Sequence, residues 1–97
     1  MILAAAIKCY VTKTNSEVIL CGARHGDCFA QLNTLGFSPH IDYLDIEEGF
    51  IDNHNNFLTR QEAFNHAKEI GQLSSKIVYE REHGEIGNNK LISEDLW

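Results

Sequence analysis

Apolar residues recur at helical spacing in two separate stretches of the chain. The first stripe comprises Cys28, Phe29, Leu32 and Leu35. Gly36 follows it directly, and a glycine there is typical of a helix C-terminus because it adopts a positive φ at no steric cost. The pattern predicts a helix over residues 26–36.

The second stripe carries a clear start signal. Thr59 is followed three residues later by Glu62, the spacing of a capping box in which each side chain accepts a hydrogen bond from the other residue's amide. The apolar face that follows is made of Ala63, Phe64, Ala67 and Ile70. Together with Gly71 after it, this pattern predicts a helix over residues 60–70.

Runs rich in β-branched and aromatic residues predict the strands. Residues 2–12 and 18–21 flank a polar Thr-Asn-Ser segment and are expected to form an antiparallel hairpin. Further strands are expected over about residues 47–51 and over residues 76–79. Residues 52–56 are rich in Asp and Asn, which favour a turn because their side chains bond nearby backbone.

These elements predict an α+β fold in which an antiparallel sheet of about four strands carries two helices on one face. The helix residues expected to pack on the sheet are Phe29, Leu32, Leu35, Phe64, Ala67 and Ile70. A length of 97 residues fits a single domain over residues 1–97. The other sheet face is left for solvent or a partner, so we expect a homo-oligomer.

The C-terminal part of the chain is more polar. Residues 80–85 are too polar to be buried and are expected to form an exposed loop or sheet edge. The only tryptophan, Trp97, ends the chain. We expect its ring to pack on another segment.

Charge and composition exclude several classes of partner. The net charge is −6, from 14 acidic and 8 basic residues, and no basic stripe is present that could neutralise a row of phosphates. Polymeric nucleic acid is therefore not an expected partner. The longest apolar run, residues 2–7, is far too short to span a membrane. We expect a cytoplasmic protein without a cofactor.

The three cysteines invite a metal-site hypothesis. Cys21, His25 and Cys28, with Cys9 upstream, only partly fit the ligand spacing of a zinc site. In the alternative interpretation the cysteines are reduced and behave as small apolar residues, and His25 is a hydrogen-bonded loop residue. We expect no metal.

Catalytic motifs are missing from the sequence. Five histidines make chance pairings with Cys or Ser easy. A nucleophile elbow, a P-loop and a Gly-rich dinucleotide fingerprint are all absent. We therefore do not expect an enzyme.

Two of the few arginines stand at predicted helix starts. Arg24 and His25 lie between a strand and a helix, where backbone amides, a guanidinium and an imidazole could meet one anion. Arg60 lies in the first turn of the second helix, where the helix dipole disfavours a cation. Such a placement is evidence for a role in binding. The alternative is that both arginines are ordinary surface residues.

Five short motifs are spread along nearly the whole chain. They are Gly22-x-Arg24-His25, Glu48-Gly49-Phe50, Phe57-x-x-Arg60-x-Glu62-Ala63, Gly71-Gln72 and Ser93-Glu94-Asp95-Leu96. In this order they resemble a family of small proteins carried by bacteriophages and mobile elements. Within it, the chain is similar to the phage anti-Thoeris proteins, which sequester cyclic ADP-ribose-type immune signals without degrading them.

The resemblance implies an oligomer whose pocket stacks a base on an aromatic ring, clamps phosphates with arginines and hydrogen-bonds ribose hydroxyls. The ligand-binding residues that it implies are Arg24, His25, Phe50, Phe57, Arg60, Gln72, Ser93, Glu94 and Asp95. Glu48 departs from the family pattern, in which a neutral Gln is expected, and the segment over residues 80–89 is short and acidic. Two other functions stay open: an acidic module that binds and inhibits a host defence protein, and a small nucleotide-cleaving enzyme.

Overall fold

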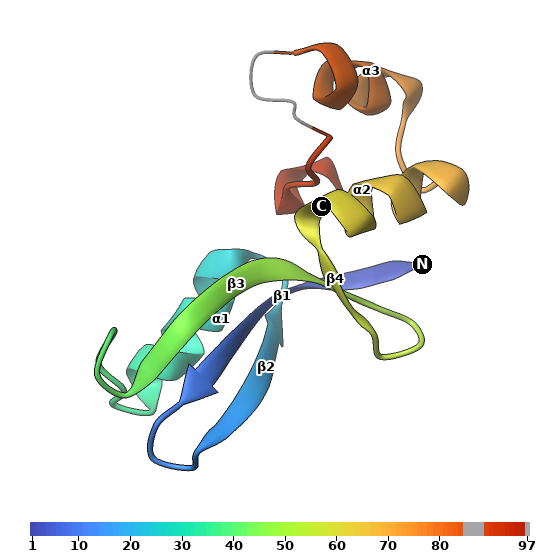
Figure 1. The fold of residues 1–97 in the computed structure, drawn as a ribbon. Helices are drawn as coiled ribbons and strands as arrows, with labels where there is room; N and C mark the ends of the chain where they lie inside the picture. The colour runs from blue at the N-terminus through green and yellow to red at the C-terminus, as the bar shows by residue number, and fades with distance from the viewer. Residues whose placement is uncertain (85–88, 97) are drawn as a thin grey trace.

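The computed structural model describes residues 1–84 and 89–96. Its strands form one antiparallel sheet with the order β2-β1-β3-β4 (Figure 1). The strands are β1 (Ile2–Val11), β2 (Ser16–Gly22), β3 (Tyr43–Asp52) and β4 (Phe57–Thr59). The helices are α1 (His25–Thr34), α2 (Arg60–Glu69) and α3 (Ser75–His83), followed by a 3-10 turn, Ser93–Asp95. The predicted α+β fold with a four-stranded antiparallel sheet is confirmed.

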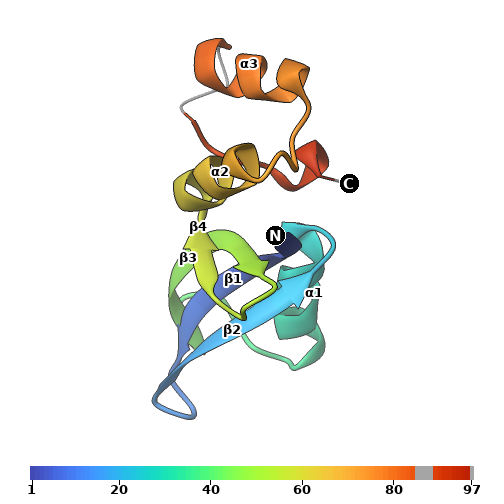
Figure 2. The same cartoon turned by 90° about the vertical axis from the view of Figure 1, so that its right-hand side faces the viewer.

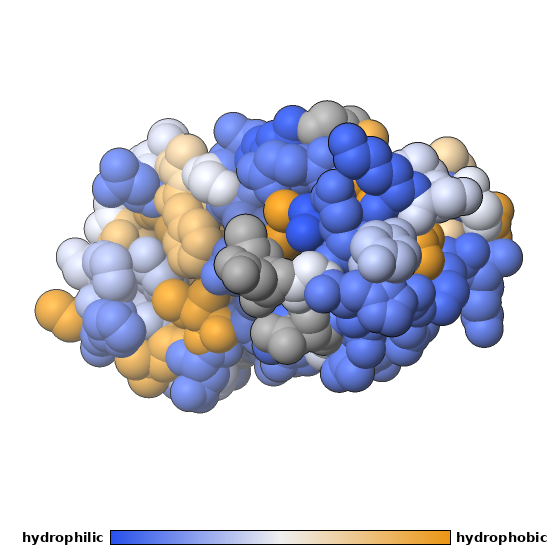
Figure 3. Space-filling view, turned by 90° about the horizontal axis from the view of Figure 1, so that it is seen from above, coloured by the Kyte–Doolittle hydropathy of each residue, from blue (hydrophilic) through white to orange (hydrophobic). Residues whose placement is uncertain are grey.

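The sheet is strongly twisted, and its helices divide between its two ends. β1 pairs with both β2 and β3, and its register with β3 shifts twice, as at β-bulges, which increase twist. Figures 1 and 2 show α1 lying against β1 and β2, whereas α2, α3 and the C-terminal segment stack beyond the other end of the sheet. Seen from above, polar residues dominate the side where α2 and α3 lie, and apolar residues gather toward the side of α1 (Figure 3).

This division produces two buried clusters. The cluster under α1 contains Ile7, Cys9, Val11, Cys28, Leu32 and Tyr43. The cluster under α2 contains Ile2, Ala5, Phe50, Ala63, Phe64, Ala67 and Leu91. β1 runs through both clusters: Ile2 and Ala5 lie in the cluster under α2, and Ile7, Cys9 and Val11 lie farther along the strand in the cluster under α1. Burying one large apolar side chain stabilises the fold by about 1.5–3 kcal/mol, so Phe50 and Phe64 anchor the α2 end.

Both predicted helices are confirmed, and so are the capping box and the two C-terminal glycines that predicted them. Thr59 Oγ1 accepts the Glu62 amide at 3.1 Å, and Glu62 Oε1 accepts the Thr59 amide at 2.9 Å. Gly36 and Gly71 have φ of 77° and 73° beyond the helix ends. The expected packing of Leu35 and Ile70 is wrong, because these residues are the C-caps, where the chain leaves the helix. Their exposed fractions are 61% and 48%.

The strand expected over residues 76–79 is wrong, because this segment belongs to α3. Ser74 caps that helix by accepting the Ile77 amide at 3.2 Å, and Val78 packs against the α2 cluster. A local cap therefore outweighs the β-branched composition. The loop or edge expected over residues 80–85 is helical as far as residue 83, and its last residue lies outside the described part. So does Trp97, whose packing stays a prediction.

The strand expected over about residues 47–51 begins earlier, at Tyr43. Asp45 has a φ of 53° and lies where the β1–β3 register shifts. The extra residue breaks the alternation of apolar positions, which hides the first half of β3 from a pattern search. The predicted turn over residues 52–56 is confirmed, because the Asp52 carboxylate accepts the amides of His54 and Asn56 at 2.9 and 2.8 Å.

Candidate functional site

Three polar side chains form a connected row where the starts of α1 and α2 meet β3. His25 Nε2 lies 2.8 Å from the Gly49 carbonyl oxygen, and because a carbonyl only accepts, this nitrogen carries the hydrogen. Its Nδ1 lies 4.0 Å from Glu48 Oε1. The same carboxylate oxygen accepts a hydrogen bond from Arg60 Nη2 at 3.1 Å. Glu48 therefore links the two helix starts that the sequence singled out.

Arg60 lies in a hollow of about 310 Å³ at the start of α2. The hollow is lined by Glu48, Thr59, Arg60, Gln61 and Lys90. The Nε atom of Arg60 is buried and has no hydrogen-bond partner among the described residues, although 31% of the side chain is exposed. A buried donor without a partner costs about 1–3 kcal/mol, so an acceptor brought by a ligand would recover that energy.

Lys90 and Gln61 were not recognised in the sequence as site residues. Lys90 reaches the hollow because the next residue, Leu91, is buried and donates its amide to the Arg60 carbonyl at 3.0 Å. This contact joins segments 31 positions apart (91 − 60). Nothing in the local sequence around Lys90 signals it. Gln61 could have been found from its position beside Arg60.

The two predicted stacking rings have different environments. Phe50 is completely buried and meets the His25 ring edge-on, with centroids 5.2 Å apart, so it has no exposed face for a base. Phe57 is half-buried, and its ring lies over Gly49. The Lys8 ammonium lies 5.0 Å from the centroid of Phe57. Alternation along β4 places Phe57 and Thr59 on the same sheet face.

Arg24 lies apart from the hollow. Its Nη1 donates to the Ser93 carbonyl at 3.0 Å, and its backbone amide donates to Asp27 Oδ2 at 3.0 Å. Ser93 is buried, and its hydroxyl lies 3.5 Å from Glu94 Oε2. These contacts fasten the C-terminal turn to the start of α1.

Two other predicted site residues hold the fold together. Gln72 accepts the Ile2 amide and donates to the Ile2 carbonyl, both at 2.8 Å, so its side chain acts as one more strand partner for β1. Asp95 pairs with Arg81 through both carboxylate oxygens. Of the nine residues that the resemblance implied, the structure therefore brings Arg60 to the hollow, with His25 joined through Glu48.

Two of the three cysteines are buried thiols, and the third, Cys21, is exposed. Cys9 and Cys28 are buried, and burial is the main reason that the pKa of the Cys28 thiol rises to about 11. A thiol with so high a pKa is a poor nucleophile at neutral pH. Within residues 1–84 and 89–96, no three His, Cys, Asp or Glu residues are grouped in a way that could hold a metal ion. None of the helices described there is long and apolar enough to cross a membrane.

Comparison with models of known protein families shows which family the chain belongs to. A family model described as the phage T4 y16D protein matches residues 1–97. The chain belongs to the phage T4 y16D family. No curated protein and no solved structure matches it. The expected membership in a family of small phage proteins is therefore confirmed for this y16D family member.

Proposed function

We propose that this y16D family member binds a small anionic ligand of the nucleotide class and holds it without cleaving it. The observation that carries the proposal is the buried, unpartnered Nε of Arg60, which lies in a hollow shared with Lys90. Two cations and a donor without a partner suit the oxygens of a phosphate. The resemblance to anti-Thoeris proteins points to a cyclic ADP-ribose-type molecule as the ligand.

The other groups of the hollow suit the rest of a nucleotide. Glu48 keeps Arg60 oriented through one Nη atom, and a carboxylate with 42% of its side chain exposed can accept from ribose hydroxyls. Phe57 does not line the hollow, but its half-buried ring lies on the sheet face of Thr59, where a base that extends beyond the hollow could stack. A volume of about 310 Å³ is at the lower end for small-ligand sites, which fits a phosphate and ribose with the base outside.

Retention of the ligand without chemistry is supported by the composition of the hollow. Among the residues that the structure describes, its lining contains neither a cysteine nor a histidine. The Thr59 hydroxyl already accepts the Glu62 amide as a helix cap. A nucleophile with an adjacent base, which cleavage requires, is not among these lining residues. We also propose that the protein acts as a homo-oligomer in the cytoplasm of the phage host.

The proposal is tested by incubating the protein with cyclic ADP-ribose isomers, removing unbound ligand, denaturing the protein by heat and analysing the released molecules by chromatography. Intact ligand in the heated fraction supports sequestration. A cleaved product would make the protein an enzyme instead. Absence of any ligand with every isomer, while the protein is folded, would overturn the assignment to this nucleotide class.

A second candidate function is an acidic module that binds and inhibits a host defence protein. The observation that favours it is the net charge of −6 together with exposed carboxylates on β3, such as those of Asp45 and Glu47. Clustered charge of one sign speeds association with an oppositely charged surface. A basic host protein recovered on the immobilised wild-type chain, and lost on an Asp45→Lys/Glu47→Lys variant, would favour this function over ligand sequestration.

A further inference from the structure

β2 lies at the edge of the sheet, and within residues 1–84 and 89–96 no strand lies on its outer side. Natural edge strands are commonly protected by Pro, by Lys or by a bulge. The segment Ser16–Gly22 contains no Pro, Lys or Arg. Its pairing with β1 runs in continuous register from Val11–Ser16 to Ala5–Gly22. β2 is therefore an unprotected edge.

The hydrogen-bonding groups on the free side of β2 can be assigned from its neighbours. Thr12 donates its amide to the Asp42 carbonyl on the β3 side, so even-numbered residues of β1 face β3 and odd-numbered ones face β2. The partners of those odd-numbered residues are Val18, Leu20 and Gly22. The amides and carbonyls of Glu17, Ile19 and Cys21 therefore point to the free side. Gln31 Nε2 donates to the Cys21 carbonyl at 2.7 Å, which agrees with this assignment. This carbonyl at the C-terminal end of β2 therefore already has a hydrogen-bond donor.

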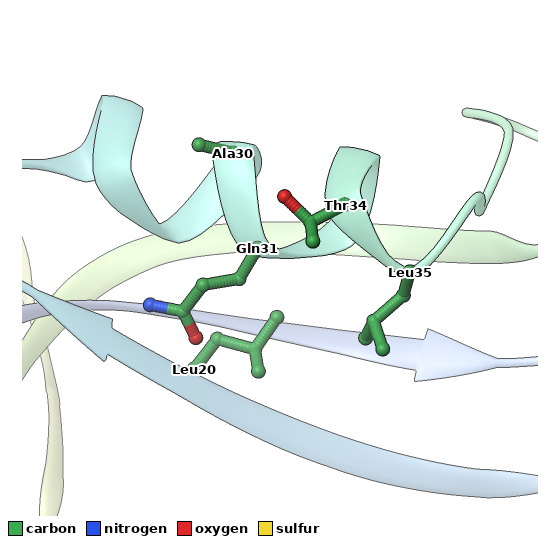
Figure 4. A pocket seen from close by; sticks show the side chains of 5 residues that line it. All are labelled: Leu20, Ala30, Gln31, Thr34 and Leu35. Carbon is green, nitrogen blue, oxygen red and sulfur yellow. The ribbon is translucent and has the colours of Figure 1, made fainter.

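The surface along this edge is apolar. A groove of about 420 Å³ lies between α1 and β2 and is lined by Leu20, Ala30, Gln31, Thr34 and Leu35 (Figure 4). Leu35 is 61% exposed beside the groove, and Ile19 is 42% exposed on the opposite sheet face. A strand laid along β2 would cover the mouth of the groove and part of Ile19.

We propose that β2 pairs antiparallel with β2 of a second copy of this chain, with Val18 on the two-fold axis. In this register Glu17 lies opposite Ile19 of the second copy, and both residues present free backbone groups. The two equivalent pairs form four hydrogen bonds. They form without displacing Gln31 from Cys21, whereas a register centred on Ile19 would need that bond to break.

Charge complementarity supports the same register. Ile19 lies beside Lys8 in the β1–β2 pairing, so a row across the joined sheets reads Tyr10, Glu17, then Ile19 and Lys8 of the second copy. The Lys8 ammonium lies 5.0 Å from the centroid of Phe57, on the β4 side of the sheet, so it has to turn away from that ring to approach the Glu17 carboxylate of the second copy across one apolar residue. Symmetry repeats this pair. The two Glu17 carboxylates do not face each other, although the chain as a whole is acidic.

The first test is self-association measured by sedimentation equilibrium. We expect the wild-type protein to form dimers. Glu17→Lys places a cation near Lys8 of the second copy and should weaken the dimer at least tenfold. Glu69→Lys makes the same charge change at an exposed position on α2 and should leave the dimer unchanged. A wild-type protein that stays monomeric up to its solubility limit, or equal effects of the two variants, would overturn the proposal.

The second test measures the register by disulfide formation in a Cys9→Ala, Cys21→Ser background, because Cys9 lies directly opposite Val18 within one copy. Val18 on the axis forms a pair with a Cα separation of about 4.5 Å, which a disulfide can bridge. Two Glu17 residues would be about 8 Å apart, which is too far. Val18→Cys should therefore cross-link faster than Glu17→Cys under mild oxidation, even though Glu17 is the more exposed residue. The opposite order of rates would refute this register.

Discussion

Arg81 and Asp95 form a bidentate ion pair that joins α3 to the C-terminal turn. Arg81 Nε donates to Asp95 Oδ2 at 2.8 Å, and Nη2 donates to Oδ1 at 2.7 Å. The hydrogen bond to Asp95 raises the pKa of Arg81. Only 2% of the Asp95 side chain is exposed. Asp95, which the family resemblance implied as a ligand contact, thus uses both carboxylate oxygens to stabilise the fold.

Removal of either partner of this pair should destabilise the protein. Arg81→Ala leaves the buried Asp95 carboxylate without its cationic partner and with only the Ile92 amide as a donor, and the expected loss is about 3–5 kcal/mol in the free energy of unfolding. The measurement is urea denaturation. Lys68→Ala, which breaks the exposed pair with Glu82, is the control and should cost about 1 kcal/mol or less. Similar losses in both variants would show that burial does not decide the strength of the Arg81 pair.

Gly49→Ala should be poorly tolerated. An added Cβ would lie 2.2 Å from the Leu58 carbonyl oxygen and 2.6 Å from the Phe57 ring, so β4 would have to move. We expect a loss of about 3 kcal/mol or more in stability. Gly26→Ala is the matched control, because nothing lies within 4 Å of its Cβ position in α1. The control should be neutral or slightly stabilising in thermal melts.

Asp52 should make stability depend on pH in the acid range. Hydrogen bonds, first from the Asn56 amide, hold the pKa of Asp52 below its ordinary value of 3.8 against the opposing effect of burial. A depressed pKa contributes stability that is fully present above the unfolded-state value and is lost as pH falls through the folded-state value. The stability difference between wild type and Asp52→Asn should therefore shrink as the pH falls below 3.8. A difference that is constant across this range would contradict the expectation.

Gln72 should contribute to stability and not to ligand affinity. Gln72→Ala leaves the Ile2 amide and carbonyl without their side-chain partner, at an expected cost of about 1–3 kcal/mol. Gln72→Glu should also be destabilising, because a carboxylate cannot donate to the Ile2 carbonyl. Guanidinium denaturation measures both variants. A stable Gln72→Ala protein that has lost ligand binding would return Gln72 to the site.

Alanine substitutions of Arg60 and Arg24 should affect different properties, ligand affinity for Arg60 and thermal stability for Arg24. Arg60→Ala removes the unpartnered donor and should lower ligand affinity by about 1.5–3 kcal/mol, or roughly tenfold to a few hundredfold in Kd, with little change in Tm. Arg24→Ala should lower Tm instead, because it frees the C-terminal turn at Ser93. Calorimetry with cyclic ADP-ribose isomers and melting curves on both variants provide the measurement. Equal affinities of wild type and Arg60→Ala for a bound nucleotide would remove the hollow as the binding site.

Local signals in the sequence were sufficient for most elements but not for all of them. The capping box at Thr59 and the glycines after both helices predicted α1 and α2, because these signals act within a few residues. The same reasoning failed at residues 76–79, where β-branched composition indicated a strand and the Ser74 cap started α3. Composition is a weak determinant when the sheet offers the segment no neighbouring strand.

The sequence by itself determined the fold class, the two helix starts and the Asx turn at Asp52, since each rests on short-range chemistry. It also determined the phage family, through the match of a family model to residues 1–97. Only the tertiary structure decided which polar residues meet. Glu48 lies between His25 and Arg60, and Lys90 reaches the hollow because Leu91 donates to the Arg60 carbonyl. Gln72 bonds the backbone of Ile2, and Asp95 pairs with Arg81. These contacts join residues far apart in the chain. Their geometry follows from the packing of β1 and α2, which local patterns do not encode.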